Sequence, residues 1–260
     1  MNQVGHLPDS VVLITGAAVT GSAALIVAGL SRRILFVPGD AKLQVHAKLA
    51  DLVHGSLLAF TVFTLALVLT DVRSNLSKTL DAAQREASTI TRLDEELEIA
   101  GGSEAAAARR GLRLYVDAVT STDWPALGAP APTLSAQADE ALKSLRALVR
   151  AAARASPESA AAITTFLNQL EDLRLGRLES ATKAVPSIFW WIILAFLIAA
   201  MAMNGRHPLD LAGATLIALH MAAIGLVLAL ILVMDQPFRG ETSVSPATIT
   251  QALSAHRSSQ

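Results

Sequence analysis

His220 lies near the middle of the apolar stretch Leu211–Met234, which carries no other ionisable side chain. An ionisable residue at membrane depth is a candidate functional residue, because it must face a bundle interior or a water-filled path. The structural alternative is a neutral ring that hydrogen-bonds to a neighbouring helix. His220 therefore predicts either a position on a conduction path or an interhelical hydrogen bond.

A short motif, Asp235-Gln236-Pro237-Phe238-Arg239-Gly240, follows that stretch directly. Pro237 ends the helix, and Gly240 permits backbone angles that other residues avoid. Phe238 is suited to a membrane interface. Because Asp235 stands at the unfavourable end of the helix dipole, we expect it to have a cationic or backbone partner.

Arg174 and Arg177 are interleaved with Glu171, Asp172 and Glu179. Such an array could line a path for an anion. It is more often a salt-bridged helix face in contact with solvent, and both interpretations stay open at this point.

Asp51 and His54 share a helix face by their spacing, which suggests a metal site, but interfacial polar residues are the better interpretation. The chain has no cysteine. It shows no nucleophile with an adjacent base, no metal cluster and no phosphate-binding loop. We therefore expect no metal, no cofactor and no enzymatic activity.

These residues are set among four apolar stretches, Val11–Leu30, Leu52–Thr70, Val185–Met203 and Leu211–Met234. Each is long enough to cross a hydrocarbon core of about 30 Å as a helix. In a bilayer the backbone must satisfy its own hydrogen bonds, so these stretches predict four transmembrane helices of a multi-pass protein, which we place in the cell inner membrane. The small residues Ala17, Gly21, Ala24 and Ala28 predict a helix-packing face in the first. The short connection between the last two predicts a tight antiparallel hairpin.

Most of the charge lies between Val72 and Val185, which hold 14 basic and 15 acidic residues. This near-neutral balance argues against a nucleic-acid partner. Apolar residues recur at helical spacing and predict four amphipathic helices. One such face holds Leu76, Leu80, Ala83, Ala87, Ile90, Leu93 and Leu97, and another holds Leu134, Ala138, Leu142, Leu145, Val149 and Ala152. The second apolar stretch should continue into the first of them as one rod that ends at Gly101-Gly102. The second of them should end near Thr120, before the Trp124-Pro125 loop, and Pro186 should kink the helix that enters the third span.

The predicted fold is therefore an all-α membrane protein, with four transmembrane helices and an extramembrane four-helix bundle inserted between the second and third. The predicted parts are residues 1–71 with two spans, 72–185 with the bundle, 186–240 with two spans and the motif, and a tail at 241–260. Lys and Arg in the first loop place that loop in the cytoplasm, with the bundle and both termini outside.

The motif residues carry a resemblance to the bacterial bestrophin-like membrane proteins. That family's pattern, Asp-x-Pro-Phe-x-Gly followed by Val-Ser-Pro, reads here as Asp235–Gly240 and Val244-Ser245-Pro246. Further matches are Trp124-Pro125, Leu167-Asn168, Arg174, Arg177, Leu178, Pro186 and Trp190. Relatives often have Trp-Gln or Trp-Glu after the second span, where this chain has Asp71-Val72-Arg73.

The resemblance implies a protein similar to bestrophins, which are oligomeric anion channels. It also implies cytoplasmic termini, in disagreement with the charge rule. We therefore expect a lipid-embedded homo-oligomer that conducts a small ion. The alternative is a non-conducting membrane-anchored sensor or protein-interaction module.

Overall fold

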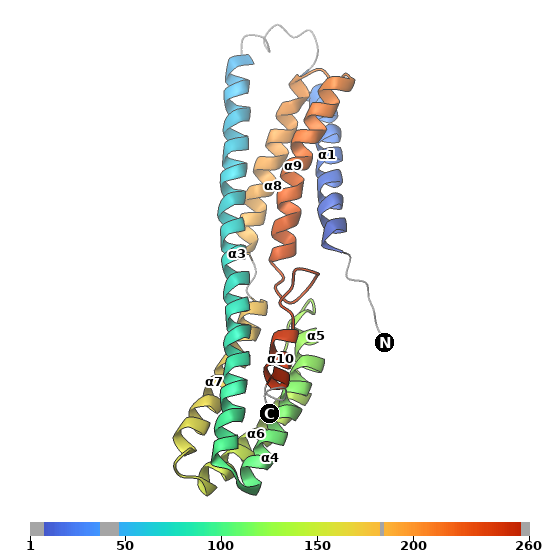
Figure 1. The fold of residues 1–260 in the computed structure, drawn as a ribbon. Coiled ribbons are helices and arrows are strands. Elements are labelled where there is room, and N and C mark those ends of the chain that lie inside the picture. The colour runs from blue at the N-terminus through green and yellow to red at the C-terminus, as the bar shows by residue number, and fades with distance from the viewer. Residues whose placement is uncertain (1–7, 37–46, 183–184, 256–260) are drawn as a thin grey trace. The chain divides into compact units, whose positions relative to one another are not determined.

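The computed structural model describes residues 8–36, 47–182 and 185–255, and every regular element within these ranges is a helix (Figure 1). The predicted all-helical class is therefore confirmed. The elements are α1 (Asp9–Ile34), α3 (Ala47–Ala100), α4 (Gly102–Ala118), η1 (Val119–Asp123), α5 (Trp124–Leu127), α6 (Ala136–Ala155), α7 (Ala160–Thr182), α8 (Ser187–Met203), η2 (Asn204–Arg206), α9 (Leu211–Met234) and α10 (Ala247–Ala255).

Four helical stretches in the described part of the chain are long and apolar enough to cross a membrane. They are Asp9–Ile34, Lys48–Ala100, Ala160–Arg206 and Leu211–Met234. The second and third stretches also include charge-rich sequence, so their apolar parts are residues 52–70 of α3 and helix α8. The chain is thus a membrane protein with four membrane-spanning helices.

The chain divides into two compact units. Unit 1 contains Met1–Arg73 and Ala184–Asp235, and therefore α1, the apolar part of α3, α8 and α9. Unit 2 contains Ser74–Lys183 and Gln236–Gln260, and therefore the polar part of α3, α4 to α7, and α10. The apolar and polar parts of α3 form one continuous helix, as predicted.

Within unit 1, α1 and α9 approach each other closely. Gly21, Ala24 and Ala28 are buried, which confirms the predicted packing face of α1. A Cβ atom added to Gly225 of α9 would lie 2.6 Å from the carbonyl oxygen of Gly16. Small residues are therefore required where the two backbones meet, as is typical of helix pairs in membranes.

The turn between α8 and α9 is tied to α1. The hydroxyl of Ser31 donates a hydrogen bond to the carbonyl oxygen of Ala202 at 2.6 Å, and Nη1 of Arg32 donates to that of His207 at 2.6 Å. The predicted hairpin has the expected short turn, but the closest backbone contacts of α9 are with α1 and not with α8. The short turn limits only the distance between the end of α8 and the start of α9. Gly16, Gly21 and Gly225 allow the close approach between α9 and α1.

Unit 2 is built around amphipathic helices whose apolar faces meet. Its fully buried side chains include Ile90 and Leu97 of α3, Leu112 of α4, Leu145 of α6 and Leu170 of α7. The predicted faces of α3 and α6 are confirmed at these positions. Gly101 has a φ of 64°, a left-handed conformation that glycine adopts without strain, and α3 ends there as predicted.

Two predictions about prolines were wrong. Helix α7 ends at Thr182 and α8 begins at Ser187. Pro186, the residue before α8, has φ −55° and ψ 137°, which are not helical angles, so the helix is interrupted where a kink was expected. Helix α4 does not give way to a loop near Thr120, because a π-helical turn, Val119–Asp123, carries the chain into α5. Pro125 stands in the first turn of α5, where its missing N–H costs nothing.

Candidate functional site

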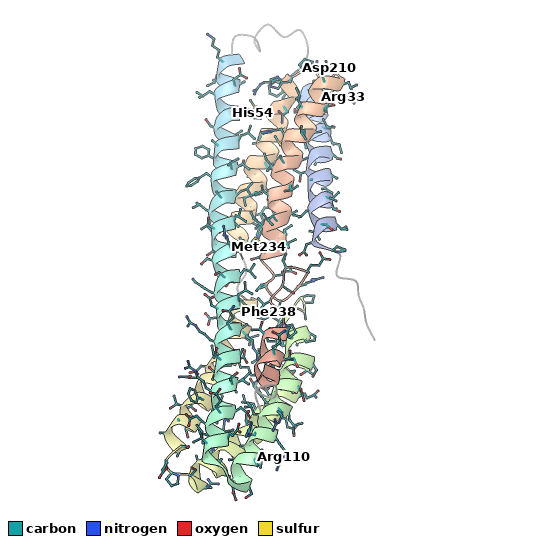
Figure 2. All side chains as sticks on the ribbon, viewed as in Figure 1. Arg33, His54, Arg110, Asp210, Met234 and Phe238 are labelled. Carbon is teal, nitrogen blue, oxygen red and sulfur yellow. The ribbon has the colours of Figure 1, made fainter. Side chains whose placement is uncertain are left out.

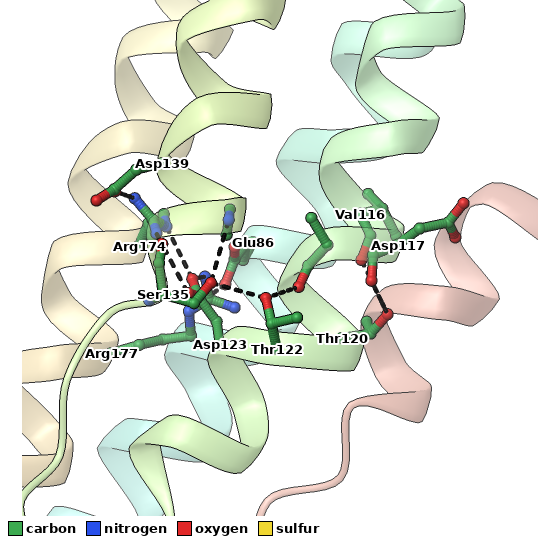
Figure 3. Close-up of polar contacts among 12 residues, drawn as sticks. Glu86, Val116, Asp117, Thr120, Thr122, Asp123, Ser135, Asp139, Arg174 and Arg177 are labelled. Atoms are coloured by element: carbon green, nitrogen blue, oxygen red, sulfur yellow. Dashed lines mark hydrogen bonds and ion pairs between the residues drawn. The ribbon is translucent and has the colours of Figure 1, made fainter.

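Arg174 of α7 is buried in unit 2 and is paired on both sides (Figure 3). Its Nε donates a hydrogen bond to Oδ2 of Asp123 at 2.8 Å, and its Nη2 donates to Oδ1 at 3.2 Å. Its Nη1 pairs with the half-exposed Asp139 of α6. The backbone N–H of Ser135 donates to Oδ1 of Asp123 at 2.7 Å. Arg174 therefore joins α7 to η1 through Asp123, which solvent does not reach, and to α6 through Asp139.

Arg177 lies one helical turn further along α7 and is 1% exposed. Its Nε is 3.3 Å from Oε2 of Glu86 on α3, and its Nη2 is 3.5 Å from Oδ2 of Asp123. Among the residues that the structure describes, no hydrogen bond reaches the guanidinium of Arg177, either Glu86 oxygen or the hydroxyl of Tyr115. The ion pairs of Arg177 are thus looser than those of Arg174.

We define the buried ionic cluster as Glu86, Asp123, Arg174 and Arg177. Its acidic and basic groups are unequal in number once the neighbouring Asp139 is counted. Three carboxylates then face two guanidinium groups. Burial raises the pKa of Glu86 from 4.5 to about 7, although the nearby Arg177 lowers it. Burial likewise raises the pKa of Tyr115 of α4, which faces the cluster. Glu86 therefore takes up a proton near neutral pH.

We expect the stability of unit 2 to fall as the pH rises. The pKa of Glu86 is about 7 in the folded protein and near 4.5 when unfolded, so its contribution is complete below pH 4.5 and is lost as the pH rises through about 7. The shift corresponds to about 3 kcal/mol of unfolding free energy. Thermal unfolding of the full chain in detergent, followed by circular dichroism between pH 5 and pH 8, measures it.

The Glu86→Gln variant should flatten this dependence, because glutamine carries no ionisable proton. Asp94→Asn is the matched control, since Asp94 is a buried carboxylate of α3 that pairs with Arg109 instead. We expect this control to retain the wild-type slope. A wild-type slope in Glu86→Gln would contradict the assignment.

Trp124 of α5 connects the buried ionic cluster to the C-terminal motif. The guanidinium carbon of Arg177 lies 5.0 Å from the centre of the Trp124 ring, a cation–π contact. The indole N–H donates a hydrogen bond to the carbonyl oxygen of Val244 at 2.8 Å, and Phe238 packs edge-on against the ring at 5.5 Å. Trp124 thus holds two residues that follow the last membrane-spanning helix in sequence.

The residues from Pro237 to Val244 form a loop that packs against Trp124. The N–H of Val244 donates to the carbonyl oxygen of Pro237 at 2.8 Å, and Gly240 has a φ of 90°. That backbone angle explains the glycine of the motif, because other side chains are strained there. Phe238, labelled in Figure 2, is buried in the core of unit 2, so it is not the interfacial residue that the sequence suggested.

The other candidate residues belong to unit 1. Oδ1 of Asp235 accepts a hydrogen bond from the backbone N–H of Val185 at 3.1 Å, which supplies the backbone partner expected of this aspartate. His220 is exposed on the surface of α9 and belongs to a different unit from the buried ionic cluster. Asp235 and His220 are thus close in sequence to Phe238, but they belong to unit 1 and Phe238 belongs to unit 2.

Asp51 and His54 face a guanidinium. Nη2 of Arg206 lies 2.7 Å from Oδ1 of Asp51 and 3.1 Å from Nδ1 of His54, and its Nη1 donates to the carbonyl oxygen of Ala50 at 3.0 Å. The pair thus anchors the α8–α9 turn to α3. This agrees with the interpretation of interfacial polar residues flanking a span.

Sequence reasoning missed Glu86, Asp123 and Tyr115. A signal for Glu86 was present, because it lies between Ala83 and Ile90 on the apolar face of α3, where an unpaired charge is not tolerated. Asp123 gave only a weak signal, as an aspartate beside a tryptophan. Its role depends on η1 and α7 meeting.

Fold and site together define a multi-pass, all-helical membrane protein with a charge-rich helical unit. The model of the Bestrophin-like domain family matches residues 15–249, which is most of the chain. The protein therefore belongs to the bestrophin-like family, which confirms the family that its sequence resembles. No curated protein and no solved structure matches the chain.

Proposed function

We propose that this protein is a homo-oligomeric membrane channel for a small ion and has no enzymatic activity. Membership of the bestrophin-like family supports this class of function. The observation that carries the proposal is the exposure of His220 on α9, a membrane-spanning helix, in the single chain. An ionisable side chain in contact with lipid tails is costly, so a second subunit or a water-filled path should cover it.

The proposed arrangement places unit 1 in the cell inner membrane. Unit 2 would lie outside the bilayer as a four-helix bundle, inserted between the second and third membrane-spanning helices. The charge in residues 72–185 supports this placement, because charged side chains at the bilayer centre are costly.

Ion flux through liposomes that contain the purified protein tests the proposal. We expect flux above that of empty vesicles, and an oligomer by mass photometry in detergent. His220→Leu should reduce the flux to the level of empty vesicles, because an apolar wall favours loss of water from a narrow path. His220→Gln should retain flux. Ile26→Leu is the control, since Ile26 is an exposed apolar residue of the membrane-spanning helix α1.

A monomer with no flux above empty vesicles, in either orientation, would exclude a channel. Retained flux in His220→Leu would leave the channel in place but remove His220 from its path.

A groove in unit 2 favours the second candidate, a non-conducting sensor or protein-interaction module. The groove has a volume of about 790 Å³ and lies between α3 and α7. Polar side chains line it, among them Asp81, Arg85, Arg92, Gln169 and Asp172. Crosslinking in membranes with mass spectrometry separates the two functions, since recovery of self-links alone would count against a partner in the groove.

A further inference from the structure

An apolar groove of about 450 Å³ lies among three membrane-spanning helices of unit 1, α1, α8 and α9. The described residues that line it fall within 12–20, 190–197 and 225–232, and none of them carries a charge. Its rim includes the exposed side chains of Val19, Leu194 and Leu232. The groove is therefore continuous with the surface that these helices present to lipid tails.

Small residues leave this space unfilled. Gly16 of α1 and Gly225 of α9 both line the groove, and a Cβ atom added to Gly16 would lie 2.6 Å from the Cβ of Ala229. Such residues let α1 and α9 approach closely, but they carry no side chain that reaches towards α8. An empty apolar space costs its lining atoms the van der Waals contacts that they would otherwise make. We therefore expect the groove to be filled from outside the chain.

The groove occupies only one half of the membrane thickness. Its lining residues come from the half of each helix that lies away from the turn η2, and they extend over seven or eight residue steps, or about 10–12 Å. Half of a hydrocarbon core is about 15 Å thick. The groove is thus within reach of the lipid tails of a single leaflet and does not cross the bilayer.

Its size favours an acyl chain over a helix of a second subunit. A helix about 10 Å in diameter and 12 Å long has a volume of roughly 900 Å³, twice that of the groove, so only one face of it can enter. An apolar cavity of about 150 Å³ holds benzene, with six carbons, and a groove three times larger has room for on the order of 18 carbons. That is the size of one acyl chain.

We propose that this groove binds one acyl chain of a phospholipid, which comes from the leaflet at the start of α1 and lies against Trp190. The site does not depend on whether the protein conducts ions, because it is formed by one chain and faces the hydrocarbon of the bilayer.

Two adjacent tryptophans of α8 provide matched reporters of the chain. Trp190 lines the groove, whereas Trp191 is 68% exposed. The variant Trp191→Phe keeps Trp190, and Trp190→Phe keeps Trp191; both keep Trp124, which is buried in the core of unit 2. Each is reconstituted in phosphatidylcholine vesicles with and without bromine on the acyl chains, since bromine quenches the fluorescence of an indole that it contacts. We expect both reporters to be quenched.

Val19→Phe places a ring at the rim of the groove, where it competes with the acyl chain. Quenching of Trp190 should fall about two-fold, as for loss of most contacts with one chain, while quenching of Trp191 stays unchanged. Leu232→Phe enters the groove from α9 and should give the same result if Val19→Phe does not fold. Ile14→Phe is the control, because Ile14 is 69% exposed on α1 but does not line the groove.

Either of two results would overturn the proposal. Trp190 that is not quenched without a further substitution would show that protein, such as a second copy, covers the groove. Quenching of Trp190 that is equal with and without Val19→Phe and Leu232→Phe would show that the ring meets only lipid outside the groove. Native mass spectrometry is the second measurement: the wild type should retain one phospholipid per chain and Val19→Phe should lose it, and equal retention would contradict the site.

Discussion

Arg177→Ala is expected to destabilise unit 2 by about 3–5 kcal/mol, as is typical when one partner of a buried ion pair is removed. Arg177 is 1% exposed and is among the largest fully buried side chains of the described chain. Its loss leaves Glu86 without its cation and leaves a cavity beneath Trp124. Thermal or chemical unfolding of the full chain in detergent, followed by circular dichroism, measures the change.

Arg146→Ala is the matched control. Arg146 pairs with Glu171 at 2.8 Å in the same unit, but its side chain is 38% exposed. An exposed pair of this kind contributes less than about 1 kcal/mol. The double variant Glu86→Gln with Arg177→Met should recover part of the loss, because it leaves no unpaired charge. If Arg177→Ala and Arg146→Ala lowered the free energy of unfolding equally, burial would not determine how much the cluster stabilises unit 2.

Gly225→Leu is expected to separate α1 from α9 and to destabilise unit 1 by more than about 3 kcal/mol, beyond the usual range for overpacked cores. The reason is geometric, because a Cβ atom at Gly225 would lie 2.5 Å from the hydroxyl oxygen of Thr20 and 2.6 Å from the carbonyl oxygen of Gly16. The backbone at Gly16 cannot move aside without moving α1. Gly225→Ala should cost about 1–3 kcal/mol for the same reason.

Unfolding by sodium dodecyl sulfate from mixed micelles measures this cost. Gly55→Ala is the control, because the structure places no described atom within 4 Å of a Cβ at Gly55. On an open helix surface alanine should stabilise by up to about 1 kcal/mol. If Gly225→Ala were as harmless as Gly55→Ala, the close approach of α1 and α9 would be incorrect.

The helical elements were readable from the sequence because their signals are local. Apolar stretches of bilayer length, the spacing of Leu142, Leu145 and Val149, and the pair Gly101-Gly102 each depend on neighbouring residues only. The predicted break at Gly101 and the buried face of α6 were therefore correct. Pro186 and Pro125 were misjudged because a proline permits several outcomes, and the surrounding packing selects one.

The site was only partly readable. Arg174, Arg177 and Phe238 were found from their sequence patterns, with an anion path or a solvated helix face as the interpretations of the arginines and a membrane interface as that of Phe238, whereas all three are buried. An alternating run of arginines and acids looks the same whether its partners are solvent, the same helix or another helix. Only the meeting of α3, η1 and α7 shows that Arg177 faces Glu86.

The sequence by itself determined that this protein is helical, lies in a membrane and carries its charge between the second and third apolar stretches, because hydropathy and helical periodicity act over a few residues. The tertiary structure alone decided that α9 contacts α1, and that a loop after the last membrane-spanning helix is held by Trp124 above a buried ionic cluster. Those contacts join residues more than a hundred positions apart, such as Trp124 and Val244. Their energy depends on burial, which no short stretch of sequence specifies.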